Sequence, residues 1–417
     1  MKILIPAIVL AAAPMFAAEP TSTAAGAINA LGIDLLHQAG KPDANLLLSP
    51  YSIQSALAMT CAGADGATRE EMARVLHYPK DDVELNGSFA ELQKALDELM
   101  QQSAMAAERF KQYGRSNDPV ILTVANRLFG QAGYDFRTAF LESVKTNYGA
   151  PFEQMDFVNN AAGATKRING WVEDQTRKRI RDLIPAGALN TLTRLVLVNA
   201  IYLKAPWAQP FHESATRPGP FHVGGGAAVE VPTMMQQHPL SYAKRDGFIV
   251  VAIPYSGGEL QFLILLPDQT DGLAALEKRL TADRLNECAN LPAQEVLLHL
   301  PRFKLEPPVM SLSGELKKLG MKSAFDEPAG SANFDRMAPR RPGDYLYLSD
   351  VFHKTFLALD EKGTEAAAAT AAIMVGRAAA LRPPKPVEVN VDHPFLFAIQ
   401  HRPSGACLFL GRVTDPR

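Results

Sequence analysis

Cysteine is scarce in this 417-residue chain, which contains only Cys61, Cys288 and Cys407. Because the number is odd and the positions are far apart, at most one pair can form and at least one thiol stays free, which gives little support for a disulfide framework. We expect all three to be small, buried apolar side chains. A surplus of charge is lacking too, since 42 Lys and Arg against 44 Asp and Glu leave a net charge of −2. This balance indicates neither nucleic acid nor a membrane as a partner.

Long hydrophobic runs are missing beyond the N-terminus, so no later segment is apolar for long enough to cross a bilayer. Residues 1–18 begin with Lys2, continue with an apolar run over residues 3–10, and end in Ala17 and Ala18. This order predicts a secretory signal peptide that is cleaved near Ala17 or Ala18. We therefore expect a secreted protein, periplasmic or extracellular, whose mature chain is residues 19–417.

Catalytic and cofactor motifs are also absent. The sequence contains no GxSxG, no HExxH and no paired CxxC. Residues 224–228 are rich in glycine but lack the lysine and the helix that a phosphate-binding loop requires. We expect no enzyme, no cofactor and no metal site. A hydrolase remains the alternative, and ester turnover that is lost on a single Ser or Cys substitution would favour it.

The rest of the chain has the composition of an ordinary globular protein, with 47% hydrophobic and 21% charged residues. Apolar spacing predicts helices over residues 24–38, 82–114, 137–148 and 162–179, and strands over residues 45–48, 120–129, 193–207, 248–255, 260–266, 295–303 and 346–359. The apolar run over residues 193–207 is too continuous for a surface strand, so we expect it centrally in a sheet covered on both faces. Ser49 and Pro50 open one helix, and Thr68 with Glu71 predicts a capping box on another.

Residues 357–382 read LALDEKGTEAAAATAAIMVGRAAALR, and two interpretations compete for them. Alanine is the best helix former, which favours a short surface helix over residues 364–375. Such a helix would be marginal in water and would have no apolar stripe with which to dock. If the same residues were extended, Thr364 would share one small, uncharged face with every second residue up to Met374, and Glu365 would lie on the other face. Small side chains suit a strand that slides between two packed strands.

The order of residues 361–372, EKGTEAAAATAA, resembles the proximal hinge of the reactive-centre loop of inhibitory serpins. The matching positions are Glu361, Gly363, Thr364, Glu365, Ala366, Ala367, Ala368, Ala369 and Thr370. In that family the cleaved residue lies sixteen positions beyond the hinge Glu, which implies that the reactive bond joins Arg377 to Ala378. Arg382 is a less suitable candidate for the cleaved residue, because Pro383 follows it and lacks an ordinary amide. A shifted register could instead use Met374 or Val375.

Other motifs extend the resemblance over nearly all of the mature chain. Residues 45–76 resemble the serpin signature that lies beneath the centre of the large sheet, and residues 386–416 resemble the C-terminal signature. Asn199, Lys204 and Trp207 match the serpin pattern NAIYxKxxW. The resemblance implies a polar cluster that must open when the loop inserts, formed by Ser49, Ser52, Asn199 and His353, with His353 bonded to an asparagine of the neighbouring strand. Helix capping by the serines and a buried core histidine are the simpler alternatives.

The resemblance implies an α+β serpin fold with three β-sheets and about eight to nine helices. It implies a single domain over residues 19–417, with an exposed reactive-centre loop over about residues 361–386. It further implies a monomeric inhibitor that acts as a suicide substrate. A trypsin-like serine protease cleaves after Arg377 and is trapped as an acyl-enzyme while residues 364–376 insert into the main sheet. A non-inhibitory serpin that acts as a binding or carrier protein is the alternative. The sequence does not identify the target protease.

Two basic segments raise the alternative of a polyanion partner. Arg109, Lys111 and Arg115 lie where some serpins have a polyanion-binding helix, and residues 176–183 read TRKRIRDL. Acidic residues near the first segment favour a solvated surface. For the second we favour a solvated helix end, whose cations offset the C-terminal dipole.

Overall fold

The structure is a computed structural model that describes residues 22–41, 43–113, 118–225, 228–365 and 385–417. Within these ranges it has nine α-helices and three β-sheets, which confirms the predicted α+β class. The predicted signal peptide, residues 1–18, lies outside the described residues. None of the described helices is long and apolar enough to cross a bilayer.

Local sequence explains where several helices begin and end. The helices are α1 (Thr23–Gln38), α2 (Pro50–Ala62), α3 (Gly66–Val75), α4 (Asp82–Gln112), α5 (Thr138–Tyr148), α6 (Phe157–Gln175), α7 (Leu273–Arg279), α8 (Ala282–Asn286) and α9 (Ser313–Lys318). The Ser22 hydroxyl accepts the N–H of Ala25 at the start of α1. Ser49 caps α2, with Pro50 in its first turn. Helix α5 ends at Gly149, which has a φ of 58°.

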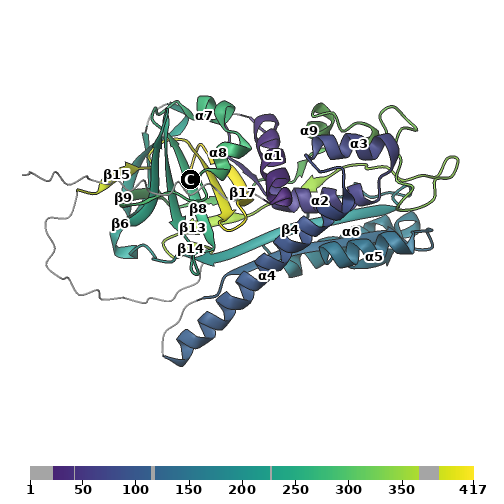
Figure 1. Ribbon diagram of the computed structural model, residues 1–417, viewed down its shortest axis with the longest axis horizontal. Helices are drawn as coiled ribbons and strands as arrows, with labels where there is room; N and C mark the ends of the chain where they lie inside the picture. The colour runs from purple at the N-terminus through teal and green to yellow at the C-terminus, as the bar shows by residue number, and fades with distance from the viewer. Residues whose placement is uncertain (1–21, 42, 114–117, 226–227, 366–384) are drawn as a thin grey trace, which may run out of the picture.

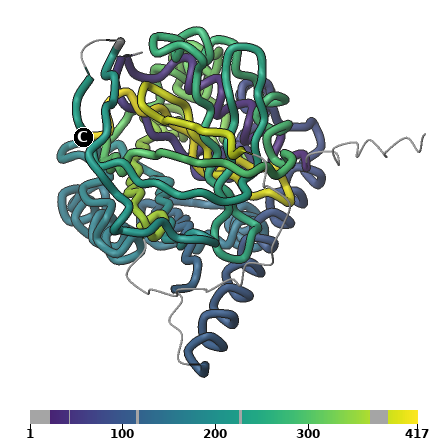
Figure 2. The backbone as a smooth tube through the Cα atoms, turned by 90° about the vertical axis from the view of Figure 1, so that its left-hand side faces the viewer, coloured from purple at the N-terminus to yellow at the C-terminus, as the bar shows by residue number. Residues whose placement is uncertain are grey.

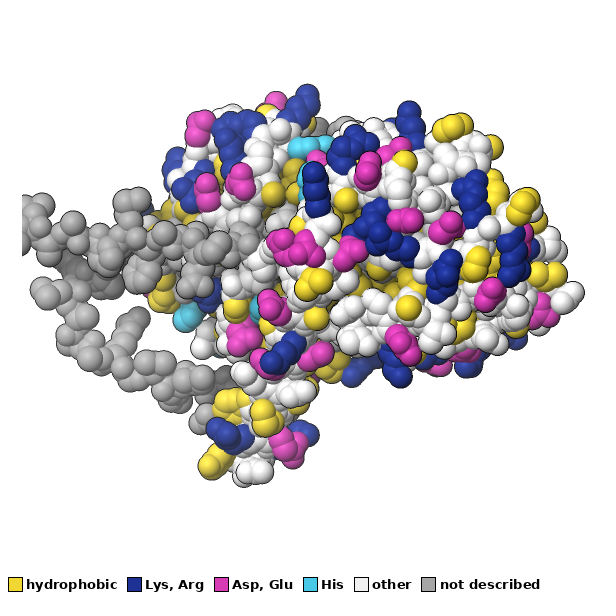
Figure 3. Space-filling view, turned by 45° about the vertical axis from the view of Figure 1, so that its right-hand side comes forward, with side chains coloured by type: hydrophobic (Ala, Val, Ile, Leu, Met, Phe, Trp, Pro, Cys, Tyr) yellow, Lys and Arg dark blue, Asp and Glu magenta, His cyan; other side chains and the backbone are white. Residues whose placement is uncertain are grey.

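Helix α4 has 31 residues, and its C-terminal part projects from the body of the molecule (Figures 1 and 2). The first two thirds are anchored by buried side chains, namely Leu85, Phe89, Leu92, Leu96 and Leu99. Met105 and Tyr113 on the projecting part are 62% and 77% exposed, and Figure 3 shows hydrophobic side chains gathered there. Apolar side chains at helical spacing therefore hold the helix only where a core lies beneath it.

The largest sheet has nine strands in the order β1-β17-β16-β8-β7-β6-β9-β15, with β5 also paired to β6. Its strands are β1 (Leu46–Leu48), β5 (Arg217–His222), β6 (Ala228–Arg245), β7 (Phe248–Pro254), β8 (Leu260–Pro267), β9 (Ala293–Pro301), β15 (Val387–Asn390), β16 (Phe395–His401) and β17 (Ala406–Val413). Every residue of β16 and β17 is buried, and the Phe262 and Phe397 rings stack at 5.4 Å. This sheet holds the larger hydrophobic core.

A second sheet has six strands in the order β10-β13-β14-β4-β2-β3, and β11 pairs with β12 in a third. The strands are β2 (Ile121–Gln131), β3 (Phe152–Met155), β4 (Leu195–Pro206), β10 (Phe303–Leu305), β11 (Met310–Ser311), β12 (Phe352–His353), β13 (Leu357–Asp360) and β14 (Gly363–Thr364). Val198 and Ala200 of β4 pack with α6, whereas Ile201 and Leu203 belong to the larger core. Strand β4 is therefore central and covered on both faces, as predicted.

Three local predictions need correction. Residues 346–359 do not form one strand, because only β12 and β13 have partners there. Helix α3 starts at Gly66, and Thr68 and Glu71 form no capping box, because they bond instead to residues 331–333 and 322–323. The helix predicted over residues 162–179 ends earlier, because α6 stops at Gln175 with Thr176 as its C-cap, so the basic residues follow the helix end rather than forming its last turn. All three cysteines are buried and free, as expected.

Candidate functional site

The predicted hinge begins as a strand already inserted in the six-stranded sheet. After β13 the chain turns at Glu361 and returns as β14, which pairs with β13 on one side and with Pro206 and Ala205 of β4 on the other. Gly363 has a φ of 148°, and a Cβ there would lie 2.1 Å from the Ala205 carbonyl oxygen. Only glycine allows this close approach, which explains the residue type at that position of the hinge.

Two stacked aromatic rings, those of Trp207 and Tyr255, bind residues of β13 and β14 by hydrogen bonds. The Trp207 indole donates to the Asp360 carbonyl at 2.9 Å, and its ring stacks on Tyr255 at 4.6 Å. The Tyr255 hydroxyl bonds to Thr364 Oγ1 at 2.5 Å, and both side chains are buried. Burial raises the pKa of Tyr255, so the phenol stays protonated and bonded. Thr364 is thus fixed by a hydrogen bond and by strand pairing together.

The hinge acid, Glu361, is anchored from a different direction. Its buried carboxylate accepts the Thr216 hydroxyl at 2.7 Å and lies 3.7 Å from the Arg302 guanidinium. A cavity of about 470 Å³ adjoins this carboxylate and is lined by Glu213, Thr216, Arg302, Asp360, Glu361 and Lys362. An ion pair and a hydrogen bond therefore hold the turn from which the loop departs.

Glu365 is the last described residue before the loop. Its N–H donates to the Ala358 carbonyl at 2.8 Å, its φ is 49°, and its carboxylate pairs with Arg179. The other predicted loop residues lie outside the described residues; they are Ala366, Ala367, Ala368, Ala369, Thr370, Met374, Val375, Arg377 and Ala378. The chain thus turns away from the sheet just after Thr364.

The edge of β4 beyond the hinge is open in the described part of the chain. One edge of β4 pairs with β2 throughout Leu195 to Lys204. On the other edge, the described strands pair only with Ala205 and Pro206. Since unpaired strand edges accept further strands, the opening can take a continuation of β14.

Three of the four predicted polar-cluster residues lie together. The Ser49 N–H donates to His353 Nε2 at 3.1 Å, and Ser49 Oγ donates to the Leu408 carbonyl and accepts the Ser52 N–H. His353 is wholly buried, and this burial lowers its pKa to about 4. The imidazole is therefore neutral at physiological pH, with Nε2 as an acceptor. Ser52 Oγ is buried with no described hydrogen-bond partner.

Asn199, the fourth residue, has a different partner from the one expected. It lies opposite Asn126 of β2, and its amide nitrogen donates to Asn126 Oδ1. His353 bonds to the Ser49 backbone, as given above, rather than to an asparagine. Asn199 Oδ1 is buried without a described partner. Sequence analysis missed Tyr255, Arg302 and Asn126 in this region.

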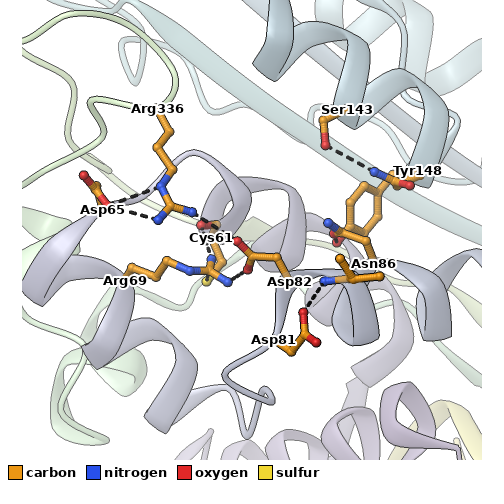
Figure 4. Close-up of polar contacts among 11 residues, drawn as sticks. Cys61, Asp65, Arg69, Asp81, Asp82, Asn86, Ser143, Tyr148 and Arg336 are labelled. Carbon is orange, nitrogen blue, oxygen red and sulfur yellow. Dashed lines mark hydrogen bonds and ion pairs between the residues drawn. The ribbon is translucent and has the colours of Figure 1, made fainter.

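A separate polar cluster lies between α3 and α4 (Figure 4). Arg69 donates to the Cys61 carbonyl and forms an ion pair with Asp82. Arg336 forms ion pairs with both Asp82 and Asp65. Burial raises the pKa of Cys61 to about 11, so this thiol is not a nucleophile at neutral pH. No group of three or more potential metal ligands occurs among the described residues.

Comparison with known proteins gives matches over nearly the whole chain. A family model described as serpin (serine protease inhibitor) matches residues 26–416. The leukocyte elastase inhibitor of Sus scrofa is 38% identical over 385 residues, which cover 90% of this chain and 94% of that protein. An uncharacterized serpin-like protein of Thermococcus kodakarensis is 36% identical over 394 residues, covering 94% of this chain and 85% of that protein.

Solved structures agree with the sequence matches. Serpin48 of the insect Tenebrio molitor, described as a highly specific serpin, gives a TM-score of 0.76 at 31% identity, covering 94% of this chain and 97% of that one. Uncleaved ovalbumin gives a TM-score of 0.78 at 26% identity, covering 94% of this chain and all of that one (100%). The arrangement of sheets and helices is thus shared with these proteins.

Proposed function

Because this chain belongs to the serpin family, we propose that it inhibits a serine protease by acting as a suicide substrate. The family is one of protease inhibitors rather than enzymes, which agrees with the absence of catalytic motifs. The observation that carries the proposal is the hinge. Two residues of β14 are already paired at one end of an edge of β4 that no other described strand occupies. The small side chains that follow Thr364 suit further insertion.

The protease performs the chemistry, whereas this chain supplies the peptide bond that is cleaved and the loop whose insertion prevents hydrolysis of the acyl-enzyme. The protease serine attacks the Arg377 carbonyl carbon, its proton passes to the protease histidine and then to the leaving amine of Ala378, and an ester remains on Arg377. Insertion then competes with attack of water on this ester. Residues 364–376 number thirteen, and at ~3.3 Å each they span roughly 43 Å, enough to carry the attached protease along the sheet.

Continuing the register of β14 predicts specific neighbours for the inserted loop. Thr364 lies opposite Ala205, so Thr370 would come opposite Asn199. Asn199 Oδ1 has no described hydrogen-bond partner, and the Thr370 hydroxyl can donate to it. Insertion would thus satisfy a buried acceptor as well as the open backbone edge, which favours the inserted state.

For specificity we propose a trypsin-like target, because Arg377 occupies the position that the family register gives to the cleaved residue. An acidic S1 pocket accepts Arg. The relatives named leukocyte elastase inhibitor support the alternative in which Met374 or Val375 is used, since elastase pockets take small apolar residues.

We also propose that the protein is secreted, on the pattern of residues 1–18, and that it acts as a monomer. A binding or carrier role remains the second candidate function.

The test is to mix the mature protein with trypsin or with an elastase, then run denaturing electrophoresis and mass spectrometry. We expect a detergent-stable complex with trypsin and a released peptide that begins at Ala378. The Arg377→Gln variant serves as the control and should form no complex with trypsin. Cleavage after Arg377 without a complex would favour the non-inhibitory alternative. A complex only with elastase would move the reactive bond.

A further inference from the structure

The basic segment of residues 176–182 lies across the opening beside β4. The Arg177 guanidinium lies over the Tyr202 ring of β4 at 5.8 Å. On the other side of the opening, the Arg179 guanidinium lies over the Phe356 ring at 5.3 Å, one residue before β13. Lys354 Nζ donates to the Arg181 carbonyl at 2.7 Å. The segment therefore contacts both sides of the gap into which a loop strand would move.

The same segment also contacts the hinge itself, through Arg179. Arg179 Nε donates to Glu365 Oε1, and the two side chains are 48% and 12% exposed. Burial raises the pKa of Glu365, and Arg179 opposes this rise by stabilising the carboxylate. The Tyr202 hydroxyl of β4 also stabilises the Glu365 carboxylate and helps to lower its pKa. Arg179 is thus the ion-pair partner of a partly buried charge at the point where the chain leaves the sheet, and Lys204 adds a weaker favourable interaction with the same carboxylate.

Glu365 cannot keep this geometry if the strand grows. Its φ of 49° is left-handed, whereas a residue of a continued β14 must be extended. In the extended register Glu365 would lie opposite Lys204, so its carboxylate must leave its present position. The contact with Arg179 therefore has to break or rearrange before residues beyond Thr364 can pair with β4.

We propose that Arg179 is a positioning residue that stops the hinge after two inserted residues and holds residues 176–182 across the opening until the loop is cut. This inference rests on the proposed inhibitory function. It also gives the TRKRIRDL segment a role within the fold, in which Arg179 binds a carboxylate of the same chain. The pair slows insertion, because its release is part of the barrier.

The experiment measures opening of the gap without any protease. A synthetic peptide of residues 366–376 is incubated with the intact protein, and the rate of its incorporation is followed by native mass spectrometry. Arg179→Met keeps an apolar stem over Phe356 but removes the charge, and Glu365→Gln removes the other charge. We expect each variant to take up the peptide roughly fivefold faster, the equivalent of ~1 kcal/mol for one partly exposed pair.

Lys178 provides the matched control. Its side chain is exposed and, among the described residues, forms no ion pair with Glu365, so Lys178→Gln removes one positive charge from the same segment without removing the Arg179 contact. This control should take up the peptide at the wild-type rate. The double variant Arg179→Met/Glu365→Gln should be no faster than either single variant, because both remove one contact.

Three results would overturn the inference: wild-type rates in both single variants, additive acceleration in the double variant, or equal acceleration by Lys178→Gln. Failure of the proposed function has a different signature. If the wild-type protein forms no complex with trypsin or elastase while the variants still take up the peptide faster, the role of Arg179 stands and the inhibitory function falls. If complexes form and the variants do not differ, only the role of Arg179 falls.

Discussion

The nine-stranded and the six-stranded sheets differ in how completely their strands are paired. In the larger sheet, β16 pairs along its whole length with β17 on one side and, from Leu396 to His401, with β8 on the other. In the smaller one, β4 pairs fully with β2 but, among the described strands, meets only two residues of β14 on its other edge. Both strands are buried, yet only β16 has its backbone satisfied on both edges. Unpaired backbone N–H and C=O groups on a buried strand edge raise the free energy of this state, and pairing with a further strand lowers it.

The comparison predicts that a charge at Thr364 would keep the smaller sheet open. In Thr364→Arg, the guanidinium would have to enter the buried space beside Tyr255, at a cost of several kcal/mol without a partner. We expect the variant to be cleaved by trypsin as an ordinary substrate, with the covalent complex almost entirely lost. Denaturing electrophoresis measures the ratio of complex to cleaved chain. Thr364→Ser, which keeps the hydroxyl, is the control, and an undiminished complex in Thr364→Arg would contradict the insertion mechanism.

Acid should weaken the contact that joins β12 through Ser49 to the nine-stranded sheet. His353 accepts from Ser49, which in turn donates to Leu408 of β17. The pKa of His353 is about 4 in the folded protein against 6.5 for an ordinary histidine, so between these values the unfolded state binds a proton that the folded state does not. The free energy of unfolding should therefore fall as the pH drops from 6.5 to 4, by up to about 3 kcal/mol.

The measurement is chemical denaturation at a series of pH values. His353→Gln can still accept the Ser49 N–H but cannot titrate, so its stability should depend less steeply on pH over this window. His401 also has a pKa lowered to about 4 by burial, so part of the slope will remain. An identical slope in wild type and His353→Gln would show that His353 is not the group that titrates.

In the smaller sheet itself, the anchor of the turn between β13 and β14 should matter less. Glu361→Gln keeps the size and the bond to Thr216 but loses the charge that faces Arg302. We expect a loss of about 1 to 2 kcal/mol in the free energy of unfolding, because a buried charge-assisted contact is replaced by a neutral one. Glu213→Gln is a matched control, since Glu213 pairs with the neighbouring Lys362 but is 68% exposed. Equal losses in the two variants would argue against a special role for Glu361.

The features that could be predicted from the sequence depend on local patterns, whereas contacts between residues far apart in the chain could not be predicted. The hinge order from Glu361 to Thr370 and the apolar run of β4 are local patterns. The structure confirms the central position of β4, whereas the role of the hinge stays a prediction. The partners of the hinge are not local, because Tyr255 is 109 residues from Thr364 and Arg179 is 186 residues from Glu365. Residues 346–359 read as one strand because apolar alternation cannot tell whether a neighbouring strand is present.

The smallest expected effect isolates the single hydrogen bond that ties the two sheets together at Thr364. Tyr255 follows β7 of the larger sheet, and Tyr255→Phe keeps its stack on Trp207 but leaves Thr364 Oγ1 buried without this partner. We expect a loss of about 1 kcal/mol in the free energy of unfolding. Thr364→Val removes the other partner, and the double variant should regain part of the loss, because no polar atom of the pair is then left unsatisfied. If the two single losses simply add in the double variant, the hydroxyls do not act as a pair, and strand pairing alone holds the hinge.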